Sequence, residues 1–470
     1  MESSRYIFKT EQKALEINLN DKLYGTFAEI GAGQEVARNF FQAGGAAGTI
    51  AKTMSAYDKT YSDAIYGVEE KSRYVCESRV YKMLDHEYDL MEDRLQPVRP
   101  ETNFFVFADT VAAINYNKTI KGNGWLGVRF QLDPYGKPNE LVLHAKMLDQ
   151  DNKLQQEAIG VLGVNMIFAC FFYKDNMDYF IHSLIDGIEN RVSIDMVSLN
   201  GTDFKHVDNR LLAMYLVKYN LTDVTMFDEK GLPLHASEWL YKKAVMVVRG
   251  HYRPPTLVTE DVFSSGFKQF IEDADQEADR CALVAELTME NLTRDGMFND
   301  EDFIARADML CAMGHCVIVS DCSNHQNLIN YLSDFKIKKL GLVIGARELL
   351  EIIEEKYEQN QDGRLLVAFG ELFTRNIKIY VYPASDLNGD ELMTAHNLPV
   401  PEGIRFLYQH LLNSEHVVEV KHYDPTLLHI MPYNVLQNII DNEDWEKHLP
   451  EAVASVIKKK SILGYQKPIN

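Results

Sequence analysis

Two glycine-rich segments near the N-terminus contain the residue types that commonly hold an anion. One contains Gly31 and Gly33 after an apolar run, and the other contains Gly44, Gly45 and Gly48. Both precede runs that we expect to be helical, and glycine lets backbone N–H groups approach an anion at a helix N-terminus. The alternative is that these glycines serve tight turns and close helix packing. The residues of the predicted anion site are Gly31, Gly33, Gly45, Gly48 and Lys52.

The first segment matches only the front of a dinucleotide-binding fingerprint. Gly31 and Gly33 follow a strand-like run, but Val36 occupies the position of the third glycine. We therefore expect a general anion site and not a dinucleotide site. Lys52 lies about one turn into the second expected helix, where it either contacts the same anion or is an ordinary solvated charge.

A second group of candidate anion ligands follows the strand-like run 244–248. Arg249, His251 and Arg253 alternate with Gly250 and Tyr252. Because the guanidinium group of arginine matches phosphate and carboxylate with two parallel hydrogen bonds, this spacing predicts a grip on an anionic substrate. We predict that Arg249, His251 and Arg253 bind substrate.

Two residues have the chemistry of acid–base catalysts. Glu286 lies in the apolar run 283–289, where a carboxylate must be paired, metal-bound or protonated. His144 lies inside the strand-like run 141–148. We predict that Glu286 and His144 are catalytic, with a buried structural pair between Glu286 and Arg249 as the alternative. We predict no metal site, and the sequence identifies no cofactor.

The elements that must position these residues alternate between short β-branched runs and helical periods. About eight strands are expected within 140–385, and helices separate most of them, which indicates βαβ units and a mostly parallel α/β sheet. The span favours a TIM-like (β/α)8 barrel slightly, and a doubly wound open sheet fits nearly as well. The expected regions are a glycine-rich helical region (1–100), a strand-rich connector (101–139), the α/β core (140–385) and a helical C-terminal region (386–470).

Composition limits the possible partners. Of 470 residues, 46% are hydrophobic and 25% are charged, as expected for a globular chain. The net charge is −21, which disfavours binding to nucleic acid or to an anionic membrane. The N-terminal residues lack a secretion signal, the apolar stretch 160–173 is shorter than a membrane span, and the six cysteines form no Cys-x-x-Cys. We therefore expect a cytoplasmic protein with free thiols and no membrane span.

Several stretches together resemble a family of uncharacterised bacterial cytosolic proteins of about this length. They are Gly25–Arg38, Gly44–Asp58, Ser62–Gly67, Phe107–Val111, Trp125–Gln131, Val207–Arg210 and Tyr241–Lys243. Members of that family carry inconsistent labels, including outer-membrane (TonB-dependent) receptor and nicotinate-nucleotide adenylyltransferase. The first label conflicts with the missing signal peptide and the missing alternating barrel strands. The second conflicts with the absence of a His-x-Gly-His-like phosphate motif after the first strand. The resemblance therefore implies no catalytic residues here.

These observations leave two functional hypotheses. The first is a cytosolic enzyme that acts on a phosphorylated small metabolite or nucleotide, with the reaction left open. The second is an oligomeric scaffold or regulatory binding protein built on an enzyme-like fold, because Walker A, Gly-x-Ser-x-Gly, His-Glu-x-x-His and kinase motifs are all absent from the sequence. In both cases we expect a homo-oligomer.

Overall fold

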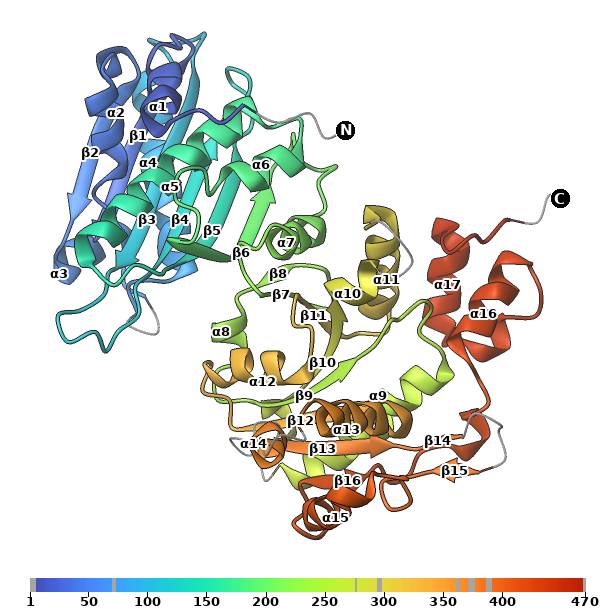
Figure 1. Cartoon of the computed structure of the whole chain (residues 1–470). Helices are drawn as coiled ribbons and strands as arrows, with labels where there is room; N and C mark the ends of the chain where they lie inside the picture. Colours follow the sequence, from blue (N-terminus) through green and yellow to red (C-terminus); the bar gives the residue numbers. More distant parts are fainter. Residues whose placement is uncertain are drawn as a thin grey trace. The chain divides into compact units, whose positions relative to one another are not determined.

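The chain folds into two compact units (Figure 1). The computed structural model describes residues 6–69, 73–274, 277–293, 298–360, 364–370, 377–385 and 391–467. Unit 1 covers Met1–Thr222, and unit 2 covers Asp223–Asn470. Each unit has its own sheet and its own buried core.

Unit 1 is built on a six-stranded mixed sheet. Its spatial order is β2-β1-β3-β4-β5-β6. The strand β1 runs parallel to β2 and β3, and the remaining neighbours are antiparallel. The strands are β1 (Leu23–Gly31), β2 (Ile50–Ala56), β3 (Asn103–Ala112), β4 (Asn123–Phe130), β5 (Asn139–Met147) and β6 (Val192–Asn200).

Helices cover both faces of this sheet. On one face, Val80 and Leu84 of α4 pack on the backbone at Gly127. On the other face, Phe40 of α2 packs on Phe27. The helices of unit 1 are α1 (Thr10–Asn18), α2 (Val36–Ala43), α3 (Lys59–Tyr66), α4 (Glu77–Leu95), α5 (Asn152–Phe172), α6 (Met177–Ser183) and α7 (Asn209–Lys218).

The most apolar helix, α5, contains the stretch 160–173 that the sequence suggests is a buried helix. By length and composition alone it is apolar enough to cross a membrane, but 72% of its most apolar window is buried inside the structure. Gly163 lies where α5 meets Val36 and Phe107. The expectation of a core helix is therefore confirmed.

Unit 2 is built on an eight-stranded open sheet. Its order is β16-β13-β12-β9-β10-β11-β7-β8, parallel from β16 to β11, with β7 and β8 antiparallel at one edge. A separate β14–β15 pair lies outside it. The strands are β7 (Val224–Phe227), β8 (Pro233–Leu234), β9 (Ala244–Arg249), β10 (Cys281–Thr288), β11 (Cys316–Ser320), β12 (Lys339–Gly345), β13 (Ile377–Tyr382), β14 (Ala384–Ser385), β15 (Leu392–Met393) and β16 (Val417–Glu419).

Helices also cover both faces of the second sheet. Gly266 of α9 approaches Met246 and Val343 on one face, and a large apolar cluster joins the other face to α12, α13 and α15. A smaller core joins α11, α16 and α17. The helices of unit 2 are α8 (Ala236–Trp239), α9 (Leu257–Asp273), α10 (Met289–Thr293), α11 (Asp300–Ala312), α12 (His325–Ser333), α13 (Ala346–Gln359), α14 (Leu365–Gly370), α15 (Arg405–Asn413), α16 (Pro432–Ile440) and α17 (Glu451–Lys460).

The mostly parallel α/β prediction is confirmed, but a barrel does not form. The sheet of unit 2 has free edges at β16 and β8, and β5 and β6 belong to the sheet of unit 1. The expected 140–385 core is thus divided between two sheets. The run after Gly48 is the edge strand β2 and not a helix, because Ile50 and Thr53 are β-branched and pair with β1.

The α5 contact makes a prediction about stability. A Cβ atom at Gly163 would lie 2.5 Å from Val36 Cγ2 and 3.0 Å from the Phe107 ring. We expect Gly163→Ala to lower the free energy of unfolding by about 1–3 kcal/mol, despite the better helix propensity of alanine. The measurement is urea unfolding. Gly48→Ala is the control, because no atom lies within 4 Å of its Cβ position, and an equal loss in both variants would contradict the packing explanation.

Candidate functional site

A cavity of about 720 Å³ opens in unit 2 beyond the carboxyl ends of β9, β12 and β13. Along the chain, β9 is followed by β10 and β11 on one side of it, and then by β12 and β13 on its other side. The loops that leave β9 and β12 therefore diverge, which opens a crevice between them. Crevices at such a reversal of strand order are where open α/β sheets bind ligands.

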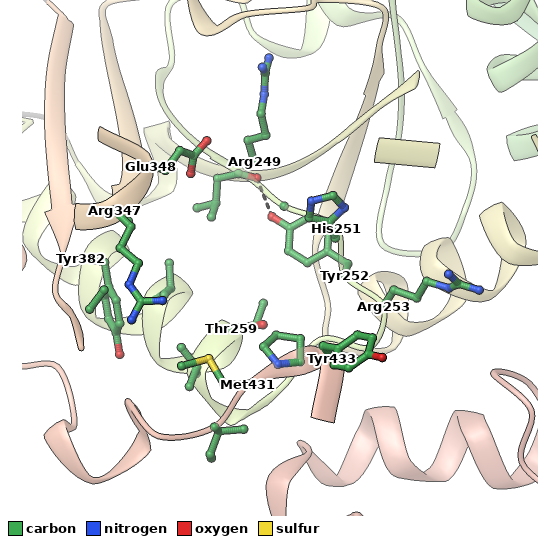
Figure 2. A pocket seen from close by; sticks show the side chains of 18 of the residues that line it. Arg249, His251, Tyr252, Arg253, Thr259, Arg347, Glu348, Tyr382, Met431 and Tyr433 are labelled. Carbon is green, nitrogen blue, oxygen red and sulfur yellow. Dashed lines mark hydrogen bonds between the residues drawn. The ribbon is translucent and has the colours of Figure 1, made fainter. Parts of the chain in front are cut away.

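The walls of the cavity differ in character (Figure 2). Four arginines line it together with one acidic residue, Glu348. The apolar and aromatic wall comes from α9 and from the segment that leads into α16. The lining arginines are Arg249, Arg253, Arg306 and Arg347. The apolar wall includes Val258, Val262, Leu428, Ile430, Met431 and Tyr433.

The turn after β9 contains the substrate-binding residues that the sequence predicts. Tyr252 has a positive φ of 50°, and its hydroxyl donates to the Val248 carbonyl at 2.6 Å (Figure 2). This conformation is uncommon for a bulky residue, and such residues often occur at functional sites. Arg249, His251 and Arg253 all line the same cavity.

The guanidinium group of Arg249 forms an ion pair with the carboxylate of Glu286. The two residues are register neighbours on β9 and β10. Arg249 Nε donates to Glu286 Oε2 at 2.8 Å and Nη2 donates to Oε1 at 3.0 Å. Ser320 Oγ also donates to Glu286 Oε1 at 2.6 Å. Because Glu286 is fully buried and is not among the lining residues, this geometry matches the structural pair that the sequence left as the alternative to catalysis.

Two more arginines share one carboxylate. Arg253 Nε lies 2.8 Å from Asp302 Oδ1, and Arg306 Nη2 lies 2.5 Å from Asp302 Oδ2. Arg306 also donates to the backbone carbonyls of His251 and Asn291, at 3.1 and 3.0 Å. Arg306 is nearly buried and therefore holds the turn after β9 in place, whereas Arg253 is one-third exposed.

The first turn of α13 contributes the other two polar groups of the cavity. Arg347 donates to the Ser385 carbonyl. Its side chain points toward Tyr382 and Met431, whereas the side chain of Arg249 points away from them (Figure 2). Removal from water raises the pKa of Glu348 to about 7, although the charge of Arg249 opposes this effect. His325 Nε2 lies 3.8 Å from Glu348 Oε1, and burial lowers the pKa of His325 to about 3.

The glycine loops that the sequence predicts to bind an anion are in unit 1. The start of α2 already binds a carboxyl group of the chain itself: Val36 N and Ala37 N donate to Glu29 Oε1 at 2.9 and 3.4 Å. Gly31 packs on the Val111 carbonyl, and Gly33 packs on the carboxyl group of Asp109. Gly33 therefore packs on an acidic group and not on a basic one, and Gly31 packs on backbone.

The remaining predicted residues of unit 1 lie in different places. Gly45 and Gly48 flank a short turn before β2. Lys52 pairs with Glu87, which also accepts from the Tyr66 hydroxyl at 2.8 Å. His144 Nδ1 lies 2.6 Å from Asp195 Oδ1 in the antiparallel half of the sheet. The structure therefore brings together Arg249, His251 and Arg253 with Glu286 behind them, and it places His144, Lys52 and the glycine loops in the other unit.

Arg347 and Glu348 are site residues that the sequence analysis did not identify. Their signal is present: Gly345 directly follows the apolar run 340–344 and precedes a helical period. A strand that ends at the start of a helix marks the ligand-binding edge of an open sheet. The sequence alone does not show that β12 lies next to β9.

Comparisons with known proteins give partial likenesses. No family model and no curated protein matches the chain. The competence/damage-inducible protein CihA from Agrobacterium tumefaciens is 16% identical, covering 35% of this chain and 98% of its own, with a TM-score of 0.26. A CinA superfamily protein from Enterobacter cloacae is 14% identical, covering 36% and 98%, with a TM-score of 0.26. Nicotinic acid mononucleotide adenylyltransferase from Plasmodium falciparum, complexed with APC, is 9% identical, covering 48% and 98%, with a TM-score of 0.29. At these values the likenesses assign no function to this chain.

The ion pair between Arg249 and Glu286 leads to a prediction about stability. Glu286→Gln leaves the Arg249 guanidinium buried without its carboxylate, so we expect the free energy of unfolding to fall by about 3 kcal/mol. Urea unfolding measures this loss. The control is Glu348→Gln, because Glu348 is only half-buried and we expect a loss below about 1 kcal/mol. Equal stability of Glu286→Gln and the natural chain would show that Glu286 is not a structural anchor.

Proposed function

We propose that the cavity of unit 2 binds a phosphate-bearing small molecule and is the substrate site of an enzyme. The observation that carries this proposal is the position of the arginine-lined cavity at the reversal of strand order between β9 and β12. A volume of about 720 Å³ is within the usual range for sites of small molecules and cofactors.

The arginines divide into two roles. Arg249 and Arg306 are largely buried and hold the turn after β9 through Glu286, Asp302 and backbone carbonyls. Arg347, which donates to the Ser385 carbonyl, and Arg253, which pairs with Asp302 and is one-third exposed, lie on opposite sides of the cavity (Figure 2). A phosphate group would accept paired hydrogen bonds from such guanidinium groups. The apolar wall beside Met431 and Tyr433 would take the organic part of the molecule.

Glu348 is the proposed acid–base group of this site. It lines the cavity, and a carboxyl group with a pKa of about 7 holds a proton for part of the time near neutral pH. General acid–base catalysis is most effective when the pKa lies close to the working pH. Glu348 therefore takes the role in which the sequence analysis placed Glu286.

Loss of Arg347 tests the phosphate grip. With inorganic pyrophosphate as the probe, we expect Arg347→Ala to weaken binding by at least about tenfold, because a charged hydrogen bond is lost. Isothermal titration calorimetry of the full chain measures the affinity, and circular dichroism checks the fold. Arg405→Ala is the matched control, because Arg405 is an exposed arginine at the start of α15 in unit 2 that pairs with Glu402. Pyrophosphate that does not bind the natural chain at millimolar concentration, or that binds both variants equally, would contradict the proposal.

The charge of Glu348 makes anion binding depend on pH. Below about pH 7 the carboxyl group is mostly protonated and neutral, and above it the group is ionised and repels an anion. We expect sulfate, whose own charge is constant over this range, to bind more weakly as the pH rises through about 7. In Glu348→Gln the affinity for sulfate should fall less across the same range than in the natural chain. A pH dependence that is the same in both proteins would remove Glu348 from the site.

A further inference from the structure

Two carboxyl groups lie side by side in the core of unit 1. Glu29 on β1 and Asp109 on β3 are register partners on parallel neighbouring strands, so their side chains leave the same face of the sheet. Glu29 is 2% exposed and Asp109 is 0% exposed. Their strand neighbours in the same row are Ser55 on β2 and Leu126 on β4.

Backbone donors hold one oxygen of each group. Glu29 Oε1 accepts from Val36 N and Ala37 N at the start of α2. Asp109 Oδ1 accepts from Ile30 N at 3.2 Å. Asp109 Oδ2 is buried and has no hydrogen-bond partner within the described parts of the chain. A Cβ atom at Gly33 would lie 2.1 Å from Asp109 Oδ1, so the turn between β1 and α2 packs directly on this carboxyl group.

The charges around the pair do not neutralise two carboxylates. Glu35, at the start of α2, disfavours ionisation of Glu29, and Glu29 does the same to Asp109. The basic side chains on the covering helices pair with other acids. Arg38 lies 3.2 Å from Glu35, Lys13 lies 2.7 Å from Asp186, and Lys153 lies 3.6 Å from Glu157. The ionisable side chains of these helices are Glu11, Lys13 and Glu16 on α1, Glu35 and Arg38 on α2, and Lys153, Glu157 and Cys170 on α5.

We propose that Glu29 and Asp109 hold a shared proton inside unit 1, and that loss of this proton as the pH rises weakens the packing between β1, β3 and the start of α2. Ionising both of two adjacent carboxyl groups in a site without water costs a large free energy, because the two negative charges repel each other and neither is hydrated. One retained proton removes one of the charges and lets the buried Asp109 Oδ2 take part in a hydrogen bond. The pair thus makes the stability of unit 1 depend on pH, through the carboxyl group on which Gly33 packs, and it is independent of the cavity in unit 2.

The direction of the effect follows from the folded-state pKa values. Burial raises the pKa of Glu29 from 4.5 to about 7 and raises the pKa of Asp109 well above its usual range. The unfolded chain releases these protons near pH 4 to 5, so between that range and about pH 7 the folded unit binds more protons. Stability is therefore fully present below the unfolded pKa and is lost as the pH rises through the folded pKa. For Glu29 alone, the unfolding equilibrium constant should rise roughly 70-fold between about pH 5 and about pH 8.

The test is urea unfolding of unit 1 within the full chain. Trp125 is the tryptophan of unit 1, and Trp239 and Trp445 belong to unit 2. In a Trp239→Phe, Trp445→Phe background the fluorescence therefore follows unit 1. We expect its urea midpoint to fall between about pH 5 and about pH 8, and to do so also in about 1 M salt, which screens general charge repulsion but not a buried pair.

The variants identify the groups responsible. Asp109→Asn should make the fall of the urea midpoint between about pH 5 and about pH 8 smaller than in the parent chain, because Glu29 is then the only carboxyl group of the pair that still titrates, and it should raise the midpoint above that of the parent chain at about pH 8. Glu157→Gln, which removes an exposed acid on α5, should keep the parent's pH dependence. If Asp109→Asn does not fold, Glu29→Gln gives the same comparison, and the high-salt titration of the parent chain needs no variant. A midpoint independent of pH in high salt, or an unchanged slope in a folded Asp109→Asn chain, would overturn the proposal.

Discussion

The buried ion pair between Arg249 and Glu286 is the interaction on which the arrangement of unit 2 depends. It joins β9 to β10 at the carboxyl edge of the sheet, and Ser320 extends it to β11. Separating two such charges inside a protein is strongly unfavourable, so the pair fixes the end of β9 and the direction of the turn that follows. That turn forms one wall of the cavity, and the start of α13 forms the facing wall. The cavity exists because the strand order reverses between these two strands.

Burial of a carboxyl group has a different consequence in unit 1 than in unit 2. Glu286 is buried against the guanidinium group of Arg249, whereas Asp109 is buried next to Glu29 and Gly33. Desolvation is unfavourable for a carboxylate in both places, but among the residues that the structure describes only the first carboxylate has a counter-charge to offset it. One buried acid therefore acts as an anchor for a cation, and the other retains a proton. In the half-buried Glu348, which lines the cavity of unit 2, the same desolvation raises the pKa to about 7.

The sequence predicts the elements better than their arrangement. Apolar β-branched runs locate β9, β11 and β13 to within a residue or two, since a central parallel strand is buried on both faces. Edge strand β2 was mistaken for a helix because its side chains are half exposed and lack an alternating apolar pattern. The predicted grip of Arg249, His251 and Arg253 does line one cavity. The glycine loops did not predict that the carboxyl group of Glu29 accepts from the start of α2. They also did not predict that Asp109 lies beside Glu29, because the register of β1 and β3 joins residues 80 positions apart.

By itself, the sequence determined which runs are strands or helices, that α5 is a core helix, and that Arg249 and Glu286 belong to the same part of the fold. These features depend on local periodicity and on the requirement that a buried carboxylate be satisfied. Only the tertiary structure decided that two open sheets form in place of a barrel, that β12 lies beside β9, and that Arg347 and Glu348 face the predicted cations across a cavity. Strand order is set by packing between distant segments, and a pattern with a period of two to four residues carries no information about which strands become neighbours.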